Sequence, residues 1–125
     1  MNAVGIDVSK GKSTVAVLRP FGEVVASPFD VLHNDNDFKR LVKLIRSLPG
    51  ESKVVMEYTG TYFEPIAQFL HNNGIFVSVV NALLVHDYGG NSLRKVKTDK
   101  KDALKLASYA LDRWTELDEY VPADE

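Results

Sequence analysis

Residues Ala3-Val4-Gly5-Ile6-Asp7-Val8 predict the first strand of an α/β fold. Large apolar side chains alternate with smaller ones along this segment, and a period of two residues is typical of a β-strand. The three branched apolar side chains would therefore face a core on one side of the strand. The other side would carry two small residues and a carboxylate, which leaves room for another group to approach the backbone.

The segments directly after this strand keep the period of a β-strand. Residues 13–18 predict a second strand, and Pro20 with Gly22 predicts a hairpin into a third strand over residues 23–27. Pro28 lies at the end of that strand, where a missing amide donor is tolerated.

Helices and strands then alternate along the rest of the chain. The pattern predicts a helix over residues 38–48, a strand over 53–57, a helix over 62–70, a buried strand over 75–80 and a helix from Thr98, while residues 81–88 are compatible with a short helix. Three meandering strands followed by β-α-β crossovers predict a mixed five-stranded sheet with helices on its faces.

The composition is that of one soluble globular domain. The chain is 45% hydrophobic and 26% charged, which is ordinary for a soluble globular protein. Its length of 125 residues leaves little room for a second domain. Cysteine is absent from the sequence, which excludes disulfides, thiolate zinc sites and cysteine nucleophiles. No apolar run approaches the roughly 18 residues of a membrane span. We therefore expect a cytoplasmic protein without a membrane partner.

The net charge of −2 conceals two regions of opposite sign. Residues 112–125 carry six acids and one base, so residues 1–111 have a net charge of +3. Six of the basic residues lie between Arg94 and Lys105. Such a local cluster suits a polyanionic partner. The acidic end of the chain, after Trp114, is typical of a tail or the start of a linker.

Two strands carry a carboxylate where a charge needs an explanation. Asp7 lies within an apolar strand, and a charge there is costly unless it reaches the strand end or meets a cation. Glu57 ends the predicted strand over residues 53–57, and the carboxyl ends of parallel strands are where α/β sheets place their sites. A structural strand-end Asp7 and a turn-capping Glu57 are the alternatives without function.

Asp99 and Asp102 are three residues apart, so on a helix they share a face. That face continues as the apolar stripe Ala103, Leu106, Ala107, Ala110 and Leu111, which a solvated charge run would not normally follow. The helix dipole alone would also favour an acid at the helix start, and this alternative is stronger for Asp99.

Clustered carboxylates repel one another unless a cation lies between them. Oxygen ligands without His or Cys favour Mg²⁺, with Mn²⁺ as a substitute. Two such ions about 3.5–4 Å apart can activate a nucleophile and stabilise a leaving oxygen in phosphoryl transfer. If these four acids converge, they predict a centre for this chemistry.

Three blocks of the sequence resemble the N-terminal domain of the DEDD transposases of bacterial insertion sequences. They are Gly5-Ile6-Asp7-Val8-Ser9-Lys10, then Glu57-Tyr58-Thr59-Gly60 with Tyr62, then residues 93–103 from Leu93 to Ala103. The third block, in this order after the second, is the most specific. The family is related to the pilin-gene-inverting recombinases, and its N-terminal domain is similar to the RuvC Holliday-junction resolvase.

The resemblance implies an RNase H-like (RuvC-like) domain over residues 1–112, followed by an acidic tail or linker over residues 113–125. It implies that Asp7, Glu57, Asp99 and Asp102 are the catalytic, metal-binding acids, with Mg²⁺ or Mn²⁺ as two bound ions. It also implies DNA as substrate, a structured guide RNA (the bridge RNA), a homo-oligomer, and a location at the nucleoid of a bacterial or archaeal cell.

Family members are longer, and their C-terminal domain supplies a serine nucleophile. We therefore expect this chain to be an isolated N-terminal domain or a truncated form. Basic residues within the third block, around Asp99 and Asp102, would hold DNA phosphates near the metal, although a solvated surface is the alternative for each; they are Arg94, Lys95, Lys97, Lys100 and Lys101.

Three other functions stay open at this point. A stand-alone junction-resolving nuclease would use the same acids with water as nucleophile. An ATPase of the actin and sugar-kinase type shares a superficial likeness over Gly5-Ile6-Asp7 with Ser13-Thr14, but the chain is short for two lobes. A non-catalytic nucleic-acid-binding or assembly module would bind in a salt-dependent way without divalent ions.

Overall fold

The computed structural model describes residues 1–58, 60–87 and 98–123, and contains a five-stranded mixed sheet in the order β3-β2-β1-β4-β5. Its strands are β1 (Asn2–Ser9), β2 (Lys12–Arg19), β3 (Glu23–Leu32), β4 (Ser52–Glu57) and β5 (Phe76–Val80). The β1–β2 and β2–β3 pairs are antiparallel, whereas β1–β4 and β4–β5 are parallel. The sheet expected from the sequence is therefore confirmed.

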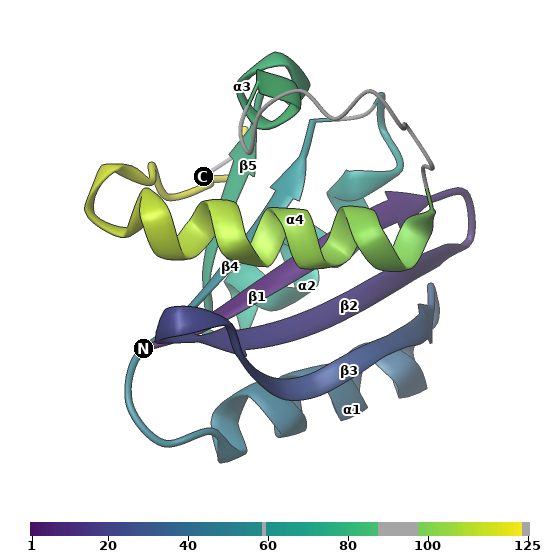
Figure 1. Cartoon of the computed structure of the whole chain (residues 1–125). Coiled ribbons are helices and arrows are strands. Elements are labelled where there is room, and N and C mark those ends of the chain that lie inside the picture. The colour runs from purple at the N-terminus through teal and green to yellow at the C-terminus, as the bar shows by residue number, and fades with distance from the viewer. Residues whose placement is uncertain (59, 88–97, 124–125) are drawn as a thin grey trace.

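The helices cover both faces of this sheet. They are α1 (Asp35–Ser47), α2 (Phe63–Asn72), α3 (Ala82–Asp87) and α4 (Asp99–Asp112), with short 3-10 turns at Pro20–Gly22 and Trp114–Glu116. Figure 1 shows α4 crossing in front of the sheet, with α1 and α2 behind it. No helix among the described residues is long and apolar enough to cross a membrane.

The alternation in β1 divides the buried residues into two cores. Val4, Ile6 and Val8 belong to the core beneath α1 and α2. Ala3, on the other face of β1, belongs to the core beneath α4. Since side chains alternate along a strand, Asp7 faces the side of the sheet that α4 covers.

The third strand is longer than the sequence predicts. β3 does not end at residue 27 but continues through Pro28 to Leu32. Val17 pairs with Ala26 and Val15 pairs with Phe29, so β3 advances three residues where β2 advances two. Pro28 falls within this irregularity of an edge strand, where its missing N–H group breaks no regular ladder.

The residues after α4 pack onto the sheet as far as they are described. Trp114 is buried in the core beneath α4. Lys53 Nζ lies 5.0 Å from the Trp114 ring and donates a hydrogen bond of 2.8 Å to its carbonyl oxygen. The backbone N–H of Tyr120 donates to the Val77 carbonyl at 2.6 Å, on β5. The acidic segment is thus in contact with the domain, and its separation from residues 1–112 stays a prediction.

Candidate metal and nucleic-acid site

Asp7 and Glu57 lie side by side at the ends of two parallel strands. β1 and β4 are in register up to the Ile6–Met56 pair, and the two acids are the next residue on each strand. The carboxyl ends of adjacent parallel strands meet at one edge of the sheet, where α/β folds place their ligands. Both side chains are half-buried at this edge.

Asp99 and Asp102 lie in the first turn of α4. Thr98 caps this helix, because its side-chain oxygen accepts a hydrogen bond of 3.1 Å from the Lys101 N–H, and its carbonyl accepts one of 2.9 Å from the Asp102 N–H. A threonine at this position favours helix initiation here. The cap therefore fixes the start of α4, and with it the position of Asp99 and Asp102 three residues apart on one face of the helix.

Gly5 brings the first half of α4 close to β1. A Cβ atom at this position would lie 2.1 Å from the Ala103 carbonyl oxygen and 2.4 Å from the Ala107 nitrogen. Such distances are impossible for a side chain, so only glycine permits this packing. The approach places the residue after Asp102 directly over the strand, two positions before Asp7.

The four carboxylates line one cavity of about 340 Å³, together with Val8, Ser9 and Thr98. Burial raises the pKa of Asp7 to about 7, helped by a hydrogen bond with the Asp99 carboxyl and by the negative charges of Asp102, Asp99 and Glu57. A shared proton between two carboxyls is the expected response of clustered acids without a cation. The acids from three elements therefore interact electrostatically.

The acids are close, but they are not arranged as a finished metal site. Among residues 1–58, 60–87 and 98–123, no three Asp, Glu or His side chains form a group that could hold a metal ion as they stand. The donor set is nevertheless the oxygen-rich type that suits Mg²⁺ or Mn²⁺. Holding an ion would require side-chain rotations that bring the carboxylates inward.

The predicted basic residues are only partly within the described structure. Lys100 and Lys101 are exposed in the first turn of α4, beside the acids. Arg94, Lys95 and Lys97 lie outside the described residues. Val8 and Thr98 also line the cavity, although the sequence analysis gave Val8 no role at the site and Thr98 only the role of a helix cap. The signal that could have identified them is their position next to Asp7 and Asp99 in the chain.

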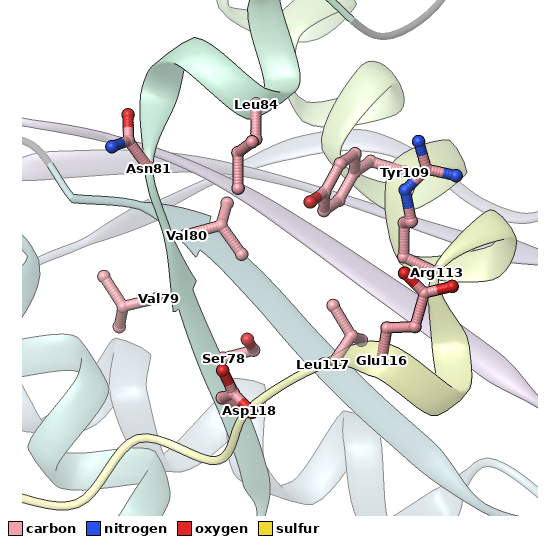
Figure 2. Close-up of a pocket in the computed structure, with 10 residues that line it drawn as sticks. All are labelled: Ser78, Val79, Val80, Asn81, Leu84, Tyr109, Arg113, Glu116, Leu117 and Asp118. Atoms are coloured by element: carbon pink, nitrogen blue, oxygen red, sulfur yellow. The ribbon is translucent and has the colours of Figure 1, made fainter.

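A second cavity of about 360 Å³ lies between β5, α3 and the segment after α4. Figure 2 shows its wall, with Ser78 and Val80 on β5 facing Tyr109 and Arg113 at the end of α4. The Arg113 guanidinium carbon lies 5.8 Å from the centre of the Tyr109 ring. None of the four acids lines this cavity, so it is separate from the candidate metal site.

Comparison with known proteins places this geometry in a family context. A family model of DEDD transposases of the IS110 group, described as transposase, matches residues 4–125. The chain is 41% identical over 56 residues to the pilin gene-inverting protein of Moraxella bovis, and 39% identical over 56 residues to that of Moraxella lacunata. Each alignment covers 45% of this chain and only 17% of the relative.

Solved structures of RuvC have the same fold. RuvC of Thermus thermophilus in complex with a Holliday junction substrate superposes with a TM-score of 0.63 at 13% identity, covering 93% of this chain and 96% of RuvC. A second Thermus thermophilus RuvC structure gives a TM-score of 0.62 at 14% identity, with the same coverage. At this identity the likeness establishes an RNase H-like, RuvC-like fold, as the sequence predicts.

Proposed function

This chain belongs to the DEDD transposase family, and we propose that it is the catalytic domain of a DNA transposase or recombinase that cuts and rejoins strands during insertion-sequence transposition. The observation that supports this most directly is the meeting of four carboxylates around one cavity. They come from the ends of β1 and β4 and from the start of α4, which are segments far apart in the sequence.

In this proposal Asp7, Glu57, Asp99 and Asp102 hold two divalent ions, with Mg²⁺ as the natural ion. Bound ions of this kind would polarise a phosphoryl oxygen and lower the pKa of an attacking hydroxyl. The raised pKa of Asp7 has a consequence at neutral pH, because its proton must leave when a cation is bound. The carboxylates would then act as ligands of the ions, and the positive charge of the ions would offset their repulsion of a DNA phosphate.

Several parts of the reaction lie with other segments or partners. Lys100 and Lys101, with Arg94, Lys95 and Lys97, would hold DNA phosphates by charge. The attacking serine would come from a C-terminal domain of a longer protein, and a structured guide RNA would select the DNA sites. A homo-oligomer would bring two DNA ends together. These assignments rest on the family resemblance.

Titration with Mn²⁺ tests the metal site on this 125-residue chain. Wild-type protein should take up Mn²⁺ in calorimetry, more tightly with DNA present, whereas Asp7→Asn and Asp102→Asn should lose most of the uptake. Asp30→Asn is a matched control, since Asp30 lies on β3 and pairs with Lys12. No uptake by the wild type even with DNA, or equal uptake by all four proteins, would contradict the proposal.

In the longer protein, recombination should be abolished by each of four conservative substitutions. They are Asp7→Asn, Glu57→Gln, Asp99→Asn and Asp102→Asn. Near-normal recombination by two or more of them would count against the assignment of these acids.

A second candidate function is a stand-alone nuclease for branched DNA. It is favoured by the 96% coverage of RuvC, which was solved on a Holliday junction substrate. In that case water would attack and no further domain would be needed. Cleavage of a four-way junction by this chain alone, with Mg²⁺, would support the nuclease; an inert chain that binds Mn²⁺ would favour the transposase domain.

A further inference from the structure

The groove between α1 and α2 carries a row of cations that the proposed catalysis does not use. Its lining residues are Lys39, Val42, Lys43, Arg46, Phe69 and Asn73, and its volume is about 280 Å³. Three of these six residues are cationic and none is acidic. Helices α1 and α2 lie on the face of the sheet opposite α4 (Figure 1). The groove between them is therefore separate from the acid cavity, which the start of α4 lines.

The spacing of the cations along α1 puts them in one row. Lys39, Lys43 and Arg46 follow one another at intervals of four and three residues, which places them on the same face of a helix. All three are exposed. Like charges at this spacing repel, each pair costing a few tenths of a kcal/mol, so stability of the helix does not explain the row.

Ion pairs within the described part of the chain do not neutralise this row. The salt bridges found there join Lys12 to Asp30, Arg19 to Glu23 and Arg40 to Asp37, and none involves Lys39, Lys43 or Arg46. The Arg46 Nη2 donates a hydrogen bond of 2.7 Å to the Asn73 carbonyl oxygen, which fixes its guanidinium at the groove. The helix C-terminus favours a cation at Arg46, but this effect does not reach Lys39.

Phe69, on α2, adds an aromatic surface to the same groove. Its ring is half-buried and packs against Phe38, with the ring centres 5.3 Å apart. Grooves that bind single-stranded nucleic acid typically combine cations along the sugar-phosphate backbone with an aromatic ring on which a base stacks. An acidic peptide would use the charges but not this ring.

We propose that the α1–α2 groove binds a single-stranded segment of nucleic acid through its phosphates, separately from the acid cavity. Lys39, Lys43 and Arg46 contact successive phosphates, and Phe69 stacks on a base. The domain would thus hold one strand at the acids and a second nucleic-acid segment on the opposite face. DNA and RNA share this chemistry, and the test distinguishes them.

The experiment measures the affinity of labelled single-stranded DNA and RNA for this chain by fluorescence anisotropy, in EDTA, between about 50 and 200 mM salt. Three phosphate contacts give a slope of log affinity against log salt near −2. In the variant that combines Lys39→Gln, Lys43→Gln and Arg46→Gln, the slope should become less negative by about 2. The strand that loses more affinity in this variant, DNA or RNA, is the one that the groove prefers.

Two single variants on the same helix separate the groove from overall charge. Lys43→Gln should make the slope less negative by about 0.7, which is the contribution of one phosphate contact on a single strand. Arg40→Gln removes the same charge, but Arg40 is paired with Asp37 and does not line the groove, so it should leave the slope unchanged. An unchanged slope and affinity in the triple variant, or equal losses in the two single variants, would overturn the proposal.

Discussion

Replacing Asp7 by Asn should stabilise the metal-free protein at high pH. The raised folded-state pKa of Asp7, about 7 against an ordinary 3.8, means that the folded protein holds a proton which the unfolded chain releases. Stability conferred by this group is therefore fully present below the unfolded pKa and is lost as pH rises toward 7. Asparagine keeps the shape and a donor for Asp99, and it removes that loss.

The size of the effect follows from the two pKa values. Each pH unit between them costs about 1.4 kcal/mol, so the full loss is about 4 kcal/mol. Water screens this half-buried carboxyl, which reduces the loss to about 2 kcal/mol. For a domain of this size, about 2 kcal/mol corresponds to roughly 8 °C in Tm.

The assay is thermal unfolding of the wild type and Asp7→Asn in EDTA, from about pH 4.5 to about pH 8. The Tm of the variant should exceed that of the wild type by an amount that grows through this range and levels off above pH 7. Glu119→Gln, at an exposed position in the C-terminal segment, is the control and should show no such trend. A gap that does not change with pH would refute the raised pKa of Asp7, and with it the combined effect of burial and neighbouring acids on this carboxyl.

Three further substitutions test the elements that position the site. Gly5→Ala should cost about 3 kcal/mol in urea unfolding, because its Cβ would overlap the Ala103 carbonyl, and it should also weaken Mn²⁺ uptake by moving α4. Trp114→Ala should cost about 3 kcal/mol in the same assay, since it empties a buried position beside Lys53; an unchanged midpoint would mean that the segment after α4 is not part of the folded unit. Thr98→Ala should cost about 1 kcal/mol and leave the fold intact by circular dichroism, because it removes one helix cap.

The sequence predicted the mixed sheet because strands and helices depend on local periods, whereas the convergence of the four acids was a hypothesis built on those elements. Alternation in residues 3–8 put Asp7 on the small-residue face of β1, and helical spacing put Asp99 and Asp102 in line with the stripe that packs on that face. The parallel pairing of β1 with β4, which brings Asp7 and Glu57 together, is a finding of the structure. These patterns made a meeting of the acids a hypothesis, and the structure places all four around one cavity.

Features that depend on contacts between distant segments could not be predicted in the same way. The alternation showed that Gly5 leaves space, but not that the Ala103 carbonyl fills it. Pro28 resembled a strand end, since the irregular pairing with β2 that accommodates it depends on the partner strand. The acidic composition after Trp114 resembled a tail, whereas the contacts of Trp114 and Tyr120 with the sheet are tertiary.

The central claim is that Asp7, Glu57, Asp99 and Asp102 share divalent ions, and diffraction from crystals soaked in Mn²⁺ tests it most directly. The account predicts anomalous peaks inside the acid cavity, with oxygen ligands from β1, β4 and the first turn of α4. Manganese found only elsewhere on the protein, with these carboxylates pointing away from one another, would contradict it.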